Sequence, residues 1–214
     1  MSVKNCGHHH YKRRKLYRRL LIGVAVLLGL IALVVFLVWI ILRPSKPHFT
    51  LQDVTIYNFT VSPSLPYTLT TTMQITIGTT NPNDRIGIYY VNLDVYGSYR
   101  NQHITLPTVL PTSYQGHREV AVWSPMLYGY TVPVSPYLQQ VLAQDLNVGA
   151  VLVNIKIDGR LKWKVGTWIS GKYQLNVNCP AYIRFSEQNS GFGVSSVMKF
   201  QLVQACSVET GLDS

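Results

Sequence analysis

The sequence predicts a mainly β protein, with a single N-terminal transmembrane helix followed by one β-sandwich domain of the immunoglobulin or fibronectin-III type. Two observations predict this fold class. Residues 20–42 form an apolar run without any charged, amide, hydroxyl or proline residue. Residues 49–208 instead alternate apolar and polar positions in short segments that end at turn residues, which is typical of strands with one buried face.

The apolar run is long enough to cross a membrane. A helix over residues 20–42 would be about 34 Å long, and a bilayer's hydrocarbon core is roughly 30 Å thick. The run has no polar face, which argues against the core helix of a soluble protein. A cleaved signal peptide would have a shorter apolar core and a small-residue cleavage site, and residues 39–44 offer no such site. The run therefore predicts an uncleaved signal anchor.

Basic residues flank the run unequally. Seven Lys or Arg residues and no acid lie in residues 1–19, whereas only Arg43 and Lys46 follow the run closely. By the positive-inside rule, the tail is cytoplasmic and the rest of the chain extracellular. The tail would also attract anionic inner-leaflet lipids, although the same residues suffice to fix the topology alone. Because the tail carries most of the net charge of +10, that charge gives no reason to expect a nucleic-acid partner.

Composition and charge divide the chain into five parts. The sequence predicts a basic cytoplasmic tail at 1–19, the signal anchor at 20–42, a proline-containing linker at 43–48, the extracellular β-sandwich at 49–208 and a C-terminal tail at 209–214. The cytoplasmic tail is too short and polar to fold alone. Within the anchor, Ala25, Gly29 and Ala32 share one helical face, and such small residues would permit close pairing of helices in a homo-oligomer.

Local patterns predict the elements of the sandwich. Strands are expected over residues 49–56, 67–79, 86–99, 102–106, 118–123 and 173–179. A break in the first pattern at Asp53 indicates a bulge or bend. Ser135, followed by a proline, can begin a helix that Gly149 ends. Residues 151–165 alternate on both sides of Asp158–Gly159, which predicts a β-hairpin with a two-residue turn at that dipeptide.

Two covalent features are expected outside the membrane. Cys179 and Cys206 can form a disulfide, but their spacing in the sequence leaves open whether they come within bonding reach. Cys6 lies in the tail and is expected to remain a free thiol. Asn58 begins the sequon Asn-Phe-Thr and is a candidate glycosylation site, the alternative being an unmodified strand residue.

No enzyme is expected. The sequence has no nucleophile elbow, no glycine-rich phosphate loop, no H-E-x-x-H and no C-x-x-C. The three adjacent histidines at positions 8–10 cannot all reach one metal ion with good geometry, and the extracellular histidines are isolated in the sequence. The sequence therefore predicts no catalytic residue, no cofactor and no metal site.

Three blocks of the sequence resemble one plant family. Residues 81–90 read Asn-Pro-Asn-Asp-Arg-Ile-Gly-Ile-Tyr-Tyr, residues 114–117 read Tyr-Gln-Gly-His, and residues 166–171 with 175–179 form a third block. They are similar to blocks of the plant harpin-induced-like proteins, relatives of the non-race-specific disease resistance protein with a late-embryogenesis-abundant type-two (water stress and hypersensitive response) domain. The residues that we select as the family motif are Asn81, Pro82, Asn83, Tyr89, Tyr90, Gln115, Gly116 and His117.

The resemblance implies a single-pass plasma-membrane protein, in some members located at plasmodesmata, that is linked to defence and stress responses. It also implies a β-sandwich without known enzymatic activity. The blocks have no settled chemical role in that family, and their residues are typical of turns between strands. We therefore expect them to define the fold first, with a shared recognition surface as the alternative.

The sequence and the resemblance together predict a membrane-anchored, non-enzymatic interaction protein of plant defence and stress signalling at the cell surface. They do not identify its protein partners. One alternative is a structural or protective linker between membrane and cell wall, in which aromatic residues such as Tyr89, Tyr90 and Trp168 would stack on a wall polysaccharide. Packing in the interior of the sandwich is the other use expected for these rings. Another is a sandwich that binds lipid in an apolar cavity.

Overall fold

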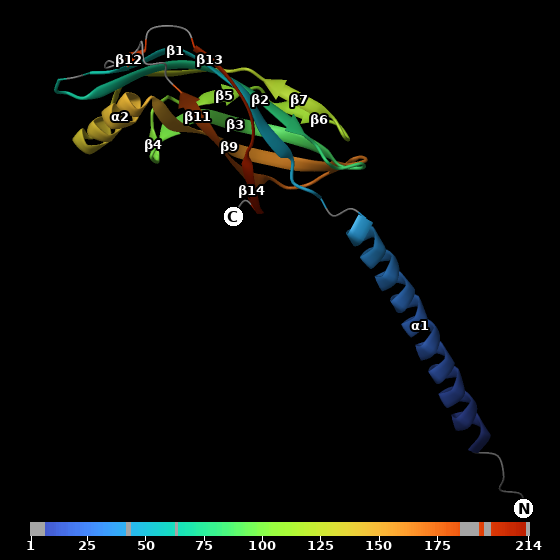
Figure 1. Cartoon of the computed structure of the whole chain (residues 1–214). Coiled ribbons are helices and arrows are strands. Elements are labelled where there is room, and N and C mark those ends of the chain that lie inside the picture. The colour runs from blue at the N-terminus through green and yellow to red at the C-terminus, as the bar shows by residue number, and fades with distance from the viewer. Residues whose placement is uncertain (1–6, 42–43, 63, 185–192, 195–197, 213–214) are drawn as a thin grey trace, which may run out of the picture. The chain divides into compact units, whose positions relative to one another are not determined.

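The computed structural model describes residues 7–41, 44–62, 64–184, 193–194 and 198–212. The chain divides into two compact units, Met1–Arg43 and Pro44–Ser214. The first unit contains one helix, and the second contains two β-sheets and a further helix (Figure 1). The boundary between the units falls inside the linker predicted for residues 43–48.

The first unit is the helix α1, Gly7–Ile41. It begins well before the apolar run, because residues 8–19 contain no glycine or proline that would interrupt a helix. The tail that the sequence predicted not to fold alone is therefore helical from Gly7. Within α1, the segment Tyr17–Phe36 has a mean hydropathy of 2.8, and none of it is buried. By length and composition, α1 can cross a membrane.

One sheet of the second unit is built on the antiparallel pair β1 and β2. Its strands are β1 (His48–Val61), β2 (Thr68–Thr80), β7 (Val120–Trp123), β8 (Met126–Pro133), β12 (Gly193–Val194) and β13 (Met198–Ala205). The strands β7 and β8 pair with β2, and β12 and β13 pair with β1. The register of β1 shifts between Leu51 and Asp53, which confirms the bulge predicted at Asp53.

The other sheet is built on β9, which pairs with β3 on one side and β11 on the other. Its strands are β3 (Gly87–Tyr99), β4 (Gln102–His103), β5 (Thr108–Leu110), β6 (Ser113–Gln115), β9 (Ala150–Val165), β10 (Trp168–Ile169), β11 (Tyr173–Arg184) and β14 (Ser207–Leu212). The short strands β4, β5 and β6 pair with β3, and β10 pairs with β9. Because β14 pairs with β11, the sandwich continues past residue 208, and residues 209–212 form part of a strand rather than a tail.

The two sheets enclose one apolar core. Along β1 and β9, buried residues alternate with more exposed ones, so that each strand turns one face inward. Both sheets supply core side chains, among them Phe49, Ile56, Met73, Ile88, Tyr90, Ile155 and Val177. This arrangement confirms the predicted fold class, a mainly β protein with a sandwich domain and an N-terminal apolar helix.

The helix α2, Pro136–Val148, is confirmed with both predicted ends. The Ser135 hydroxyl accepts a hydrogen bond from the Leu138 amide at 3.2 Å, and Pro136 occupies the first helical position. Gly149 ends the helix with φ of 80°, in the left-handed region that favours glycine. Leu138 and Leu142 are buried, so the helix packs its apolar face on the sandwich.

The predicted hairpin over residues 151–165 is wrong. The strand β9 runs through Asp158–Gly159 without a turn, and both residues pair with β11. The glycine has a different role, because β3 bulges towards it. The register of β3 shifts between Val91 and Asp94, and a Cβ atom on Gly159 would lie 2.5 Å from the Asn92 carbonyl oxygen. The close backbone approach therefore requires a glycine within the strand.

Two other predicted strands are shorter than expected. The strand predicted over residues 118–123 begins only at Val120, since Arg118 adopts φ of 54°. Of residues 102–106, only Gln102–His103 form a strand. The Ile104 amide still donates to the Gly97 carbonyl in β3, but the Leu106 amide donates to Tyr128 in β8. This segment therefore joins the edges of the two sheets.

Candidate functional site

The two parts of the family motif meet at one end of the sandwich, which we call the motif end. The β2–β3 connection contains Asn81, Pro82 and Asn83, β3 contains Tyr89 and Tyr90, and the chain at the end of β6 contains Gln115, Gly116 and His117. Pairing between β3 and β6 brings these segments together. The structure thus joins residues that the sequence places in two separate blocks.

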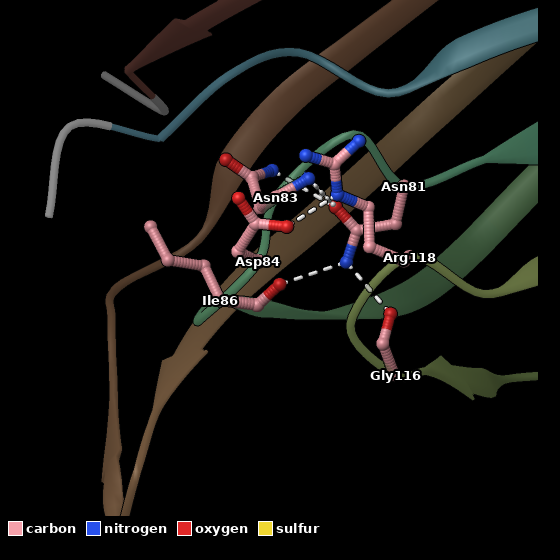
Figure 2. Close-up of polar contacts among 6 residues, drawn as sticks. All are labelled: Asn81, Asn83, Asp84, Ile86, Gly116 and Arg118. Carbon is pink, nitrogen blue, oxygen red and sulfur yellow. Dashed lines mark hydrogen bonds and ion pairs between the residues drawn. The ribbon is translucent and has the colours of Figure 1, made fainter.

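Asn81 connects the two blocks directly (Figure 2). Its side chain is completely buried. The Asn81 Nδ2 donates to the Ile86 carbonyl at 2.7 Å and to the Gly116 carbonyl at 2.8 Å. Its Oδ1 accepts from the backbone amide of Asn83 at 3.1 Å and from the Asn83 Nδ2 at 2.9 Å. Only an amide offers both donors and an acceptor in this geometry.

Asn83 binds the start of the second unit. Its Oδ1 accepts from the Ser45 amide at 2.8 Å, and its Nδ2 donates to the Ser45 carbonyl at 2.8 Å. The backbone carbonyl of Asn83 also accepts from the Arg118 amide at 3.2 Å. The chain therefore enters the sandwich at the motif end, where the Asn83 side chain binds both the backbone amide and the backbone carbonyl of Ser45.

A second buried polar cluster lies beneath the motif. The Tyr90 hydroxyl donates to Gln115 Oε1 at 2.8 Å, and the Gln115 Nε2 donates to the carbonyls of Thr79 and Glu119 at 2.9 and 2.8 Å. Burial raises the pKa of Tyr90, so its hydroxyl stays protonated and able to donate. The Tyr90 ring packs edge-on against Trp123, with centroids 5.4 Å apart. This cluster therefore links β2, β3 and β6 by hydrogen bonds inside the sandwich.

Charged residues form the outer rim of the motif end. Arg118 forms an ion pair with Asp84, and this hydrogen-bonded guanidinium lowers the pKa of the Asp84 carboxyl. Both side chains are mostly exposed, and exposed ion pairs contribute little to stability. His117 is also exposed. Because Asn81 and Gln115 use their polar atoms inside the protein, the geometry supports the fold-defining interpretation of the motif.

Sequence reasoning did not include Ser45 or Arg118 in this site. Ser45 contacts Asn83 across 38 residues of the chain, and Arg118, which directly follows His117, contacts Asp84 across 34. No local pattern marks either residue, and each becomes part of the site only because the strands place it there.

An aromatic cluster covers the outer face next to the motif. The rings of Tyr89 and Tyr114 lie 4.6 Å apart, centroid to centroid. The Lys164 Nζ lies 5.0 Å from the Tyr114 centroid and 5.7 Å from the Tyr89 centroid, which is a cation–π arrangement. The Tyr114 side chain lies over Gly87, where a Cβ atom would be 2.4 Å from the Tyr114 hydroxyl oxygen and 2.7 Å from its ring atom Cε2.

A polar hollow lies on the outer face of the sheet that contains β9. It has a volume of about 560 Å³, and its lining includes Tyr96, Lys156, Asp158, Asn176, Asn178 and Glu209. The Tyr96 hydroxyl donates to Asp158 Oδ2 at 2.6 Å. Burial and this bond raise the pKa of Tyr96 to about 12. The hollow offers amide, carboxylate and ammonium groups to a hydroxyl-rich ligand.

The remaining sequence-predicted residues lie apart from the motif end. Cys179 in β11 and Cys206, between β13 and β14, are joined by a disulfide with Cα atoms 4.4 Å apart. Asn58 lies within β1, half-buried and opposite Thr72. Its Oδ1 is buried and has no hydrogen-bond partner among the described residues. Glycosylation at Asn58 stays a prediction.

Metal coordination has no candidate in the described part of the chain, where no group of three or more His, Cys, Asp or Glu residues is arranged to hold an ion. The three tail histidines all lie within α1.

Comparison with known proteins gives one consistent family. The family model "Late embryogenesis abundant protein" matches residues 76–179. NDR1/HIN1-like protein 1 of Arabidopsis thaliana is 48% identical over 207 residues, covering 96% of this chain and 99% of that protein. NDR1/HIN1-like protein 12 of the same plant is 46% identical and covers 97% and 99%, and NDR1/HIN1-like protein 26 is 40% identical and covers 72% of each. With a β-sandwich whose motif blocks meet at one end, the chain belongs to the NDR1/HIN1-like family.

Proposed function

We propose that this chain is a membrane-anchored, non-enzymatic interaction protein of plant defence and stress responses. In this proposal α1 is a single-pass anchor in the plasma membrane, including its plasmodesmal regions, and the sandwich faces the outside of the cell. Family membership supports the defence and stress role. The sandwich then presents its surfaces to proteins outside the cell.

The observation that carries the proposal is the exposure of α1. None of the residues in Tyr17–Phe36 is buried, although their mean hydropathy is 2.8. A soluble protein would not leave such a helix in water, because each large apolar side chain loses about 1.5–3 kcal/mol of burial energy. A bilayer buries the whole segment, and the basic residues before it favour a cytoplasmic N-terminus.

Protease protection tests the topology. Protease added to intact plant protoplasts should remove the sandwich and leave a short membrane-bound fragment that contains α1. Asn58 provides a second readout, since the full chain should shift on glycosidase treatment and an Asn58→Gln variant should not. A sandwich that stays fully protected until detergent is added would overturn the assigned orientation.

Proximity labelling tests the interaction role. A labelling enzyme fused to the C-terminus should mark a reproducible set of surface proteins after elicitor treatment. The matched control carries only residues 1–48 before the enzyme, so it shares the anchor and lacks the sandwich. If the two fusions label the same proteins, the sandwich does not recruit partners and the proposal fails.

The polar hollow favours a second candidate function, a linker between membrane and cell wall. Its amides and carboxylates, with Lys156 beside them, match the hydroxyl-rich surface of a polysaccharide. Retention on wall polysaccharides should fall for Asn178→Ala in the hollow and persist for Gln140→Ala on α2. If the hollow binds the polysaccharide, the Trp168→Ala variant should be retained like the unsubstituted chain. If the sugar stacks on Trp168, retention of this variant should fall. Equal retention of all variants would count against a linker.

The structure gives no support to a lipid carrier with an internal cavity. Such a carrier needs apolar space between its sheets. At the motif end that space contains packed aromatic rings, with Phe49 6.1 Å from Tyr90 and 6.4 Å from Trp123, measured between centroids. We therefore do not propose this function.

A further inference from the structure

The turn from β9 to β10 exposes large apolar side chains that do not pack in the core of the sandwich. Trp168 is 61% exposed and Ile169 is 46% exposed. The other two tryptophans of the sandwich, Trp123 and Trp163, are at most 9% exposed and belong to the core. Gly166 forms the turn with φ of 57°, and no atom lies within 4 Å of the place where its Cβ would be. The turn therefore presents an indole and an isoleucine to whatever lies next to it.

The surroundings of this turn are basic. Residues 160–172 contain four Lys or Arg residues and no acid. Lys164 pairs with Ile169 across β9 and β10, and its Nζ lies 5.7 Å from the Tyr89 ring centroid and 5.0 Å from the Tyr114 ring centroid. Lys172, three residues after Ile169, is exposed. Exposed aromatic rings next to Lys side chains are typical of proteins that contact the interface of a phospholipid bilayer, where rings enter the headgroup layer and ammonium groups bind phosphate.

The turn lies at the motif end, where the chain enters the sandwich. Lys164 pairs with Gly87, the first residue of β3, directly after the β2–β3 connection that holds Ser45 through Asn83. Helix α2 leads into the other end of β9, so it lies at the opposite end of the sandwich (Figure 1). The exposed tryptophan and the bound linker residue therefore share one end of the second unit.

This inference rests on the proposed function, in which α1 spans the bilayer. Ser45 follows Ile41, the last residue of α1, by four positions. A chain advances at most about 3.6 Å per residue, so four residues reach no farther than about 14 Å. The headgroup layer is itself several ångströms deep, and an anchored chain would hold its motif end at that layer.

We propose that the β9–β10 turn is a second membrane contact of this protein. Trp168 and Ile169 enter the headgroup region of the bilayer that α1 crosses, and Lys164 and Lys172 bind lipid phosphate groups. The occupant of the exposed apolar turn is thus the phospholipid surface. This contact would fix the orientation of the sandwich on the membrane and leave the polar hollow and α2 for other partners.

Fluorescence quenching by brominated lipid tests the contact. The full chain carrying Trp39→Phe, which removes the tryptophan of α1, is reconstituted in phosphatidylcholine bilayers with or without bromine near the top of the acyl chains. Trp168 emission is the difference between this protein and the Trp39→Phe/Trp168→Phe variant. We expect it to lose about half of its intensity in brominated bilayers, since interfacial side chains lie within reach of those bromines. Adding Lys164→Gln and Lys172→Gln should weaken the loss.

A matched control places an exposed indole at the opposite end. Tyr137 in α2 is 69% exposed, and Tyr137→Trp in the Trp39→Phe/Trp168→Phe background should be quenched by aqueous acrylamide and not by brominated lipid. If Trp168 emission behaves like this control, the inference is overturned. A turn that binds a protein instead of lipid would give this result. Flotation separates the two proposals: a chain that floats with the vesicles without quenching keeps its anchor and loses the contact. A chain that does not float overturns both.

Discussion

Asn81 joins two segments of the chain, the β2–β3 connection and the segment that follows β6, through one buried amide. Its side chain contacts the carbonyls of Ile86 and Gly116 and the amides of Asn83. A buried carbonyl or amide that loses its hydrogen-bond partner lowers the free energy of unfolding by about 1–3 kcal/mol. Asn81 therefore stabilises the sandwich by keeping these groups paired. Asn83 uses its remaining atoms on Ser45. The side chains of Asn81 and Asn83 therefore fix the β2–β3 connection and the position at which the chain enters the sandwich.

Substitution of Asn81 should destabilise the sandwich strongly. Asn81→Ala leaves the Ile86 and Gly116 carbonyls without their donor, and we expect a loss of about 3 kcal/mol in the free energy of unfolding. Urea unfolding of the full chain in detergent, followed by tryptophan fluorescence, measures it. Asn178→Ala, at an exposed position of β11, is the control and should change stability by less than about 0.5 kcal/mol. Equal unfolding midpoints would contradict the role of Asn81.

Two tyrosines should make the fold sensitive to alkaline pH. Burial and a hydrogen bond to a carboxylate raise the pKa values of Tyr96 and Tyr99 to about 12, the partners being Asp158 and Asp145. In the unfolded chain the pKa of both tyrosines is about 10. The folded state therefore binds these protons more tightly, and the resulting stability is complete below pH 10 and lost as pH rises towards 12.

The measurement is the urea midpoint as a function of pH, together with a phenolate absorbance titration. The Tyr96→Phe/Tyr99→Phe double variant has no phenol protons to lose at these sites. Its stability should fall less than that of the unsubstituted chain between about pH 10 and 12. Parallel curves for the two proteins would show that these tyrosines are not the cause.

At the scale of elements, β9 shows what a sequence pattern can and cannot predict. The alternation over residues 151–165 correctly indicated strand, because one face of β9 lies on the core. The dipeptide Asp158–Gly159 indicated a turn, since that is where this pair most often occurs. Its glycine is instead required by the bulge of β3, which lies more than 60 residues away in the chain. Long periodic elements and helix caps can be predicted because residues close together in the sequence determine them. Backbone contacts between strands depend on residues that are far apart in the sequence.

Gly159 should tolerate no side chain. In Gly159→Ala the new Cβ would lie 2.5 Å from the Asn92 carbonyl oxygen and 2.9 Å from the Leu93 Cα, both backbone atoms that cannot rotate away. We expect a loss of about 2–3 kcal/mol, typical of overpacking within a core. Thermal unfolding by circular dichroism measures it. Gly211→Ala in β14, with no atom within 4 Å of its Cβ, is the matched control, and an equal effect of both would refute this explanation.

At the scale of the whole molecule, the sequence predicted the division into an apolar helix and a sandwich, because each part has its own period and composition. Two of the blocks that resemble the family, residues 81–90 and 114–117, lie apart in the sequence, and the structure brings them together. The sequence did not predict Ser45 or the partner of Asp84, since such contacts exist only when distant strands are in register. The bonded pair Cys179–Cys206 was left open for the same reason, as only the fold sets the distance between its Cα atoms.

The disulfide should stabilise the whole sandwich. It closes a loop of 27 residues between β11 and the start of β14, which in the chain-entropy model is worth about 3–4 kcal/mol. Cys179→Ser/Cys206→Ser should lower the urea midpoint accordingly, and Cys6→Ser should leave it unchanged. Alkylation of the denatured chain should modify one cysteine without reductant and three with it. Three modified cysteines in the absence of reductant would show that the bond does not form in the cell.

The two hydrogen bonds between Asn83 and Ser45 would also affect how the sandwich carries a mechanical load. Tension from a bilayer would enter at Ser45 and continue along β1, which lies between β2 and β13. If a wall or a neighbouring cell pulled on the opposite end, the force would run parallel to these strands and load many hydrogen bonds at once, in shear. An optical trap that pulls between the N-terminus and Tyr137 should find unfolding at high force, and opening of β1 bond by bond at low force would contradict it. The domain would then act as a load-bearing coupling between a moving membrane and a fixed surface.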